Sequence, residues 1–218
     1  MREKAPYSTE FDDIYFYPED GIGESTAVFL DGVDAPEIWQ GQDEFITAEL
    51  GFGTGLNFLL TAKLWLETAE DDQKLIYYST EKYPLKATEI DDAIHWPELQ
   101  DVKAEMLNAY PDGGQLFDGR IELNILLGDS LEELRKHSFK ANAWYLDGFA
   151  PSKNPDMWLD DIFSEVARLS ASEARLATFT AAGFVRRGLM EKGYDMSKRP
   201  GFGNKREMLS GVFKNKGG

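Results

Sequence analysis

The sequence contains no cysteine and only two histidines among its 218 residues. Without cysteine, disulfide bonds, thiolate metal ligands and cysteine nucleophiles are excluded, and two histidines argue against a histidine-rich metal site or a serine–histidine hydrolase. His95 and His137 lie in no motif, and we expect both to be surface or packing residues. The chemistry must therefore come from carboxylates, hydroxyl groups and the backbone, and we predict no metal site.

Long hydrophobic runs are also missing. No apolar stretch approaches the roughly 18 residues that a membrane helix needs, and residues 1–6 (MREKAP) lead into acidic residues instead of a signal-peptide core. With 42% hydrophobic and 28% charged residues, the chain has the material for a full core and is not of a disordered composition. We predict a single cytoplasmic domain spanning residues 1–218, with no membrane partner.

Positive charge is scarce and unevenly placed. The chain has 23 Lys and Arg residues against 39 Asp and Glu residues, a net charge of −16. An anionic polymer would be attracted only to the segment from residue 183 onward, where basic residues outnumber acidic ones. An ordinary solvated surface gives the same pattern, and composition leaves both interpretations open. The basic residues of this segment are Arg186, Arg187, Lys192, Lys198, Arg199, Lys205, Arg206, Lys214 and Lys216.

Strand-like and helix-like segments alternate along the chain. Strands are predicted at residues 44–50, 74–80, 121–127, 143–146 and 175–179. Helices are predicted from residue 56, on both sides of Trp96-Pro97, from about residue 130, and within residues 156–169. The alternation favours a doubly wound α/β fold, a parallel sheet with helices on both faces and ligands at the carboxyl ends of the strands. Residues 1–40 are predicted to form an N-terminal hairpin or lid on a core of residues 41–218.

A glycine-rich turn, residues 49–55 (ELGFGTG), joins the first predicted strand to the first predicted helix. Gly51, Gly53 and Gly55 let the backbone approach a ligand closely, and the helix N-terminus favours an anionic group. A dinucleotide fingerprint requires Gly or Ala where this chain has Leu56, which makes NAD the weaker candidate. The spacing instead resembles motif I of class I S-adenosylmethionine-dependent methyltransferases, and a tight turn without a ligand is the alternative.

Acidic residues end three later strands. Glu81 can accept hydrogen bonds from two ribose hydroxyls, and Asp129 can accept one from an adenine amino group. Asp147 ends the fourth strand. Each is equally explained alone as a helix cap or a strand-ending residue, and their joint placement around one turn favours a cofactor site.

Longer segments resemble the methyltransferases that complete the methylaminomethyl group of wobble uridine in bacterial tRNA, the MnmD type, equivalent to the N-terminal half of bifunctional MnmC. The segments are residues 49–58 (ELGFGTGLNF), 79–84 (STEKYP), 146–158 (LDGFAPSKNPDMW), 177–188 (ATFTAAGFVRRG) and 201–209 (GFGNKREML), with 11–16 (FDDIYF), 23–25 (GES) and 28–30 (VFL). Two features depart from that family: residues 171–174 (ASEA) replace a Pro-Gly-Gly-like turn, and the body is unusually acidic.

The resemblance implies a Rossmann-like class I methyltransferase sheet and methyl transfer from S-adenosylmethionine to 5-aminomethyl-(2-thio)uridine in the tRNA anticodon loop. In bifunctional relatives a flavin-dependent oxidase domain generates the amine; this chain is too short to include it, so we expect no flavin and a separate or fused oxidase partner. The cofactor residues implied are Glu49, Gly51, Gly53, Gly55, Asn57, Glu81, Asp129, Asp147 and Phe149.

Asp147 is the expected catalytic residue, because a carboxylate can orient an amine by hydrogen bonding and receive its proton; we favour orientation over strong base catalysis. Aromatic residues can stack on the base or contact the sulfonium, although core packing explains them equally, and basic residues can bind phosphates. The predicted substrate residues are Tyr15, Phe16, Ser25, Lys153, Asn154, Trp158, Arg186, Arg187, Lys205 and Arg206. Two alternatives stay open: a methyltransferase for a small amine or a protein, which the acidic body would attract, and a non-catalytic cofactor-binding protein.

Overall fold

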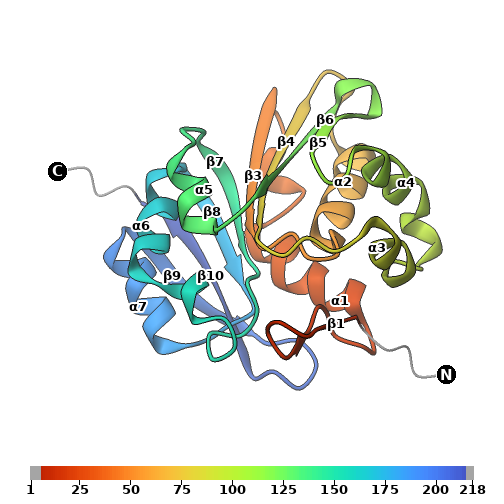
Figure 1. The fold of residues 1–218 in the computed structure, drawn as a ribbon. Coiled ribbons are helices and arrows are strands. Elements are labelled where there is room, and N and C mark those ends of the chain that lie inside the picture. Colours follow the sequence, from red (N-terminus) through yellow and green to blue (C-terminus); the bar gives the residue numbers. More distant parts are fainter. Residues whose placement is uncertain (1–5, 215–218) are drawn as a thin grey trace.

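The computed structural model describes residues 6–214, which form an eight-stranded sheet with helices on both faces (Figure 1). Its order is β5-β6-β4-β3-β7-β8-β10-β9. The central five strands, β6 to β8, are parallel, whereas β5, β10 and β9 each run antiparallel to their neighbours. The strands are β3 (Glu44–Leu50), β4 (Lys74–Glu81), β5 (Gly113–Leu116), β6 (Ile121–Leu127), β7 (Ala141–Leu146), β8 (Ser170–Thr178), β9 (Tyr194–Pro200) and β10 (Glu207–Phe213).

Two hydrophobic cores lie on opposite faces of this sheet. Side chains alternate along each strand, so Tyr145 of β7 points into one core and Trp144 into the other. Because both faces are covered, β3 and β7 are buried along most of their length. One face carries α2 (Leu56–Thr68), α3 (Ala87–Ala93) and α4 (Gln100–Ala109), and the other carries α5 (Ser130–Arg135), α6 (Asp160–Arg168) and α7 (Gly183–Glu191).

The N-terminal segment runs along the carboxyl edge of the sheet (Figure 1). It begins with a small antiparallel hairpin, β1 (Tyr7–Ser8) and β2 (Asp13–Ile14), which confirms the predicted N-terminal hairpin. Short helical elements follow: α1 (Gly21–Ser25), η1 (Thr26–Leu30), η2 (Asp31–Val33) and η3 (Glu37–Trp39). Three more turns lie elsewhere, η4 (Pro97–Leu99), η5 (Phe117–Gly119) and η6 (Pro155–Trp158).

The predicted fold class is confirmed, and two details differ from the expectation. The sheet is not wholly parallel, because three antiparallel strands extend its edges. The basic segment from residue 183 is not a tail: it forms α7 and the β9–β10 hairpin, which the sequence analysis did not assign. Of that segment, Lys216 lies outside the described residues, as do residues 1–5 at the start of the chain.

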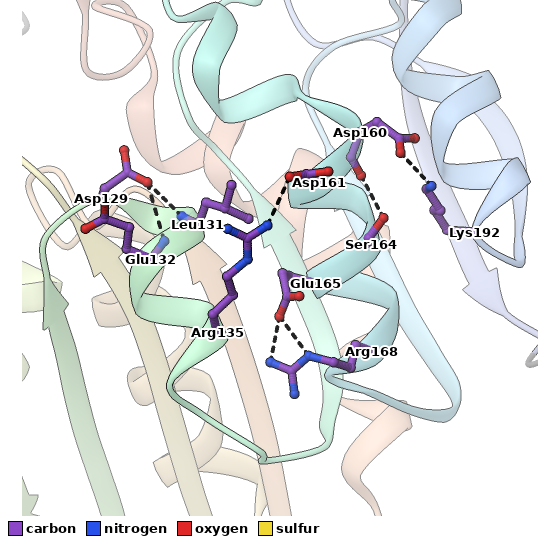
Figure 2. A network of polar contacts seen from close by, with 10 residues as sticks. All are labelled: Asp129, Leu131, Glu132, Arg135, Asp160, Asp161, Ser164, Glu165, Arg168 and Lys192. Carbon is purple, nitrogen blue, oxygen red and sulfur yellow. Dashed lines mark hydrogen bonds and ion pairs between the residues drawn. The ribbon is translucent and has the colours of Figure 1, made fainter.

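Ion pairs connect the helices of the second face (Figure 2). Arg135 of α5 pairs with Asp161 of α6 at 3.0 Å, and Asp160 of α6 pairs with Lys192, just after α7, at 2.7 Å. Arg135, Asp161 and Asp160 are exposed and Lys192 is half-buried, so each pair is open to solvent on at least one side and contributes at most about 1 kcal/mol. Their effect is to fix the spacing of the three helices. Within residues 6–214, no helix combines the length and apolarity needed to cross a membrane.

Candidate functional site

A cavity of about 550 Å³ lies at the carboxyl ends of the central strands, between the glycine-rich turn and the N-terminal segment. Parallel strands bring their carboxyl ends to one edge, which is why residues far apart in sequence meet here. Most of the predicted site residues line it: Tyr15, Phe16, Ser25, Gly51, Gly53, Asn57, Glu81, Asp129, Asp147, Phe149, Lys153, Asn154 and Lys205. Glu49, Gly55, Trp158, Arg186, Arg187 and Arg206 do not.

The glycine-rich turn brings bare backbone to the cavity. Gly51 and Gly53 have φ of +91° and +54°, a left-handed conformation that glycine adopts without strain. A Cβ on Gly51 would lie 2.9 Å from the carbonyl oxygen of Asp147, and one on Gly53 would lie 3.0 Å from the ring of Tyr15. Any side chain there would close the space between β3, β7 and the N-terminal segment.

Glu81 and Asp129 hold backbone groups on the cavity wall. Glu81 accepts hydrogen bonds from the N–H of Gly53 at 2.8 Å and of Tyr83 at 2.7 Å. Asp129 caps α5, as Figure 2 shows, and its other oxygen pairs with Lys82 at 3.1 Å. Burial raises the pKa of Asp129, but the bonds from Lys82 and from backbone N–H groups outweigh it and hold the pKa below its usual value. The cap predicted as an alternative role for Asp129 is therefore present, in a residue that also lines the cavity.

Asp147 lies at the end of β7, where its carboxylate faces the cavity and the side chain of Asn57. Burial raises the pKa of Asp147 to about 7, and nearby Glu24 raises it further, while the hydrogen bond from Asn57 and the charge of Lys205 oppose the rise. A carboxyl group with this pKa exchanges its proton near neutral pH, which is the property that proton transfer to and from an amine requires.

Beneath Asp147, Glu49 of β3 is 1% exposed. It accepts hydrogen bonds from Asn57 at 2.8 Å and from Ser79 at 2.8 Å. Burial raises the pKa of Glu49 to about 8, and the charge of Asp147 adds to this, while the bonds from Asn57 and Ser79 oppose it. Glu49 does not line the cavity and is linked to Asp147 by the side chain of Asn57. Its predicted contact with a cofactor stays a prediction.

Aromatic side chains form one wall. Phe149, with φ of +56°, lies 4.8 Å from Phe11 and 5.3 Å from Tyr15 between ring centroids. Phe16 packs on Trp96 at 5.3 Å and also lines the cavity. Faces of aromatic rings attract cations, so this wall suits a positively charged ligand or a stacked base. Trp158 is different: it is buried and donates a hydrogen bond to the carbonyl of Phe149 at 3.1 Å from outside the cavity.

The basic residues considered for RNA binding fall into three groups. Lys205 and Lys153 line the cavity, but they pair with Glu24 at 2.8 Å and Asp12 at 2.6 Å. Arg187 on α7 and Arg206 after β9 are exposed, and neither forms an ion pair within residues 6–214. Among the other basic residues of the segment, Lys192, Lys198 and Lys214 form ion pairs elsewhere. Arg186 and Arg199 are partly buried.

Sequence analysis did not single out Lys82, Tyr83 and Phe179, which also line the cavity. Lys82 closes an ion pair over one wall, and Phe179 lies 4.7 Å from the ammonium of Lys205. Lys82 and Tyr83 come shortly after the predicted strand 74–80, and Phe179 ends the predicted strand 175–179, so their position at strand ends was the available signal. His95 stacks on Trp96, whereas the ring of His137 is tilted against that of Tyr78, and neither histidine lines the cavity. No group of metal-binding side chains occurs in the described part of the chain.

The cavity fits S-adenosylmethionine on three observations. Two glycines leave room for a ligand against the backbone, two carboxylates lie at the strand ends, and an aromatic wall suits a sulfonium cation. Residues 51–53, Glu81, Asp129 and Phe149 are the ones that would hold it. Their individual roles stay predictions.

Comparison with known proteins supports this reading of the cavity. Residues 97–214 match the model of a family described as S-adenosyl-L-methionine-dependent methyltransferases. A protein of Magnetococcus marinus called tRNA 5-methylaminomethyl-2-thiouridine biosynthesis bifunctional protein MnmC is 46% identical over 98% of this chain and 33% of its own length. The protein of that name in Pseudomonas aeruginosa is 45% identical over 95% of this chain and 33% of its own length. The chain thus spans about a third of these relatives.

Solved structures agree on the fold. MNMC2 from Aquifex aeolicus superposes with a TM-score of 0.85 at 24% identity, covering 97% of this chain and 68% of that one. TrmN from Thermus thermophilus superposes with a TM-score of 0.53 at 14% identity, covering 87% and 47%. With the glycine-rich turn, the strand-end carboxylates and the family match in place, the chain belongs to the S-adenosyl-L-methionine-dependent methyltransferases.

Proposed function

We propose that the protein transfers a methyl group from S-adenosylmethionine to the primary amine of 5-aminomethyl-(2-thio)uridine at the tRNA wobble position, giving 5-methylaminomethyl-(2-thio)uridine. The observation that carries the proposal is the half-buried carboxyl group of Asp147, which lines the cavity next to the glycine-rich turn and has a raised pKa. The relatives align with 95–98% of this chain at about 45% identity, and their names support the choice of acceptor.

The residues define what the protein contributes to the reaction. S-adenosylmethionine, when bound, supplies a methyl group on a positively charged sulfur. The amine nitrogen must present its lone pair in line with the breaking C–S bond, so most of the acceleration comes from orientation. Asp147 holds an amine N–H, and after the N–C bond forms its carboxylate takes the proton that the nitrogen loses. The raised pKa of Asp147 lets it accept and release that proton near pH 7.

The acceptor base reaches the cavity from a single-stranded loop, which requires little unpairing. Exposed Arg187 and Arg206 are available for phosphates, and the aromatic wall is available for stacking. We place the reaction in the cytoplasm with its tRNA substrate. The aminomethyl group would be supplied by a flavin-dependent oxidase acting earlier, as a separate protein or a fused domain.

The test uses labelled S-adenosylmethionine and bulk tRNA from cells that lack this final methylation. We expect label in 5-methylaminomethyl-(2-thio)uridine after nuclease digestion. Asp147→Asn should reduce turnover at least about tenfold and leave cofactor affinity within about twofold. Absence of label with intact cofactor binding would overturn the tRNA assignment and favour a small-amine or protein acceptor.

A further inference from the structure

A buried polar network ties Asp147 to the sheet and to two helices. The side-chain nitrogen of Asn57, on α2, donates to Asp147 Oδ2 at 2.7 Å and to Glu49 Oε1 at 2.8 Å. The Asn57 side-chain oxygen accepts from the hydroxyl of Ser25, at the end of α1. One amide therefore bridges two carboxyl groups that end neighbouring strands, β3 and β7.

The network leaves Asn57 a single orientation. Its two N–H groups meet carboxyl oxygens and its carbonyl meets a hydroxyl donor, so rotating the amide would place like groups against each other. Asn57 is only 8% exposed, which leaves water little access to replace a lost partner. The amide thus fixes Asp147 Oδ2, while no described residue donates to Oδ1 of this cavity-lining side chain.

The charge on the two acids is also constrained. Glu49 and Asp147 share one neutral bridge in a buried setting, where two negative charges repel strongly. The other groups facing Asp147 are Glu24 from α1, Lys205 from the loop after β9, and Tyr77 from β4. Lys205 is already paired with Glu24, so it does not neutralise a second charge on the pair.

We propose that Asn57 and Glu49 are positioning residues for Asp147: Asn57 holds one carboxylate oxygen, and Glu49 stays neutral so that the single negative charge of the pair lies on Asp147, facing the amine. This inference rests on the proposed function, because it assumes an amine acceptor. Burial raises the pKa of both carboxyl groups, and Glu49 is buried more deeply than the half-buried Asp147, which favours the proton residing on Glu49. The two groups titrate as a pair.

The first test is Glu49→Gln, which keeps the shape and the hydrogen bond to Asn57 and fixes this site as neutral. We expect the acidic limb of the kcat profile, which reports the ionisation of Asp147, to stay within about 0.3 pH unit of wild type, because Glu49 is already neutral when Asp147 ionises. A fall of the limb by about one pH unit would mean that Glu49 carries the charge in the wild type. KM for S-adenosylmethionine should stay within about twofold. A purely structural role for Glu49 would lower activity equally at every pH.

Asn57→Ser tests the bridge, since serine is too short to span both acids. We expect kcat to fall about tenfold or more, with a smaller change in cofactor affinity. Thr61→Val is the matched control: Thr61 lies one turn later on α2 and is also buried. Its hydroxyl donates to the backbone carbonyl of Asn57 at 2.7 Å and lies 3.2 Å from the hydroxyl of Tyr145, and it contacts neither acid. It should leave the pH profile in place.

A substrate-free measurement separates this inference from the proposed function. The side-chain carboxyl carbons are labelled with ¹³C and titrated by NMR, and Asp147→Asn identifies the Asp147 signal. We expect Glu49→Gln to leave the Asp147 midpoint within about 0.3 pH unit of wild type. We expect Asp147→Asn to lower the Glu49 midpoint, because the charge of Asp147 raises the pKa of Glu49. A fall of the Asp147 midpoint by about one pH unit in Glu49→Gln, or equal loss of activity at all pH values, would overturn the inference. Failure of wild type to methylate tRNA would instead reject the proposed function, and an unmoved Asp147 midpoint would still support the positioning of Asp147.

Discussion

The ammonium of Lys205 lies 2.8 Å from the carboxylate of Glu24, and this ion pair joins the loop after β9 to the N-terminal segment across 181 positions of sequence. Both side chains line the cavity. The pair sits beside Asp147, whose pKa Glu24 raises and Lys205 lowers. The charge balance at the candidate catalytic group is thus set by segments from opposite ends of the chain.

Replacing Lys205 by Met should shift this balance, because the length is kept and the charge is lost. Glu24 is then unpaired, the pKa of Asp147 rises, and the carboxylate forms only at higher pH. We expect the acidic limb of the kcat profile to move up by about half a unit or more. Lys74→Met is the control, because its ion pair with Glu122 lies at the amino ends of β4 and β6. Equal profiles for both variants would contradict the prediction.

Gly53→Ala should weaken cofactor binding. The new Cβ would lie 3.0 Å from the Tyr15 ring at a φ of +54°, so it adds both a collision and backbone strain. Such strain costs about 1 kcal/mol, and we expect a loss of affinity of about tenfold or more by calorimetry. Gly41→Ala has the strain without the collision, since φ is +74° and nothing lies within 4 Å. If Tyr15→Ala fails to restore any affinity to Gly53→Ala, the collision is not the cause.

Asp147→Asn should change stability in a pH-dependent way. The folded pKa of about 7 lies above the ordinary value of 3.8, so the folded state binds the proton more tightly. Stability of the wild type therefore falls as pH rises from about 4 to about 7, and Asn removes this loss. We expect Tm of the variant to exceed wild type by about 4–8 °C at pH 8.5, corresponding to about 2 kcal/mol, with little difference at pH 4. A Tm difference that does not change with pH would be evidence against a raised pKa of the Asp147 carboxyl group.

Asp129 has two separable roles, a cap for α5 and a carboxylate on the cavity wall. Asp129→Ser keeps a capping oxygen, so Tm should stay near the wild-type value. Cofactor affinity should fall about threefold or more, because serine does not reach as far. Asp129→Ala removes the cap as well and should cost about 1 kcal/mol of unfolding free energy. Unchanged affinity in both variants would leave Asp129 as a cap alone.

Arg187→Ala tests the proposed RNA surface. Arg187 is exposed and unpaired in the described part of the chain, so its charge is available to a phosphate. We expect weaker tRNA binding, a salt-dependence slope smaller by about one, and no change in cofactor affinity. Arg135→Ala, which loses an exposed charge already paired with Asp161, should leave the slope as it is. An equal effect of the two variants would point to overall charge in place of a specific contact.

Much of the fold could be predicted because local pattern and burial agree in the centre of the sheet. β3 and β6 have the predicted bounds, since β3 is buried along most of its length and β6 alternates buried apolar with less buried positions, and both patterns are typical of strands. The β9–β10 hairpin was missed for the opposite reason. β9 (YDMSKRP) is an edge strand whose exposed positions carry charge, so its sequence suggests a basic tail, and its strand structure depends on pairing with β10.

By itself the sequence determined the glycine-rich turn and the acids at the strand ends, because turns and strand ends have local signals. Only the tertiary structure decided how those residues are used. The tertiary structure placed Trp158 outside the cavity, where it donates a hydrogen bond to the carbonyl of Phe149. It also kept Glu49 away from the cavity surface. It also brought Asn57 between Glu49 and Asp147, 90 positions from the latter. Such contacts depend on where the first turn of α2 lies relative to the ends of β3 and β7, and no local pattern encodes a packing geometry between distant segments.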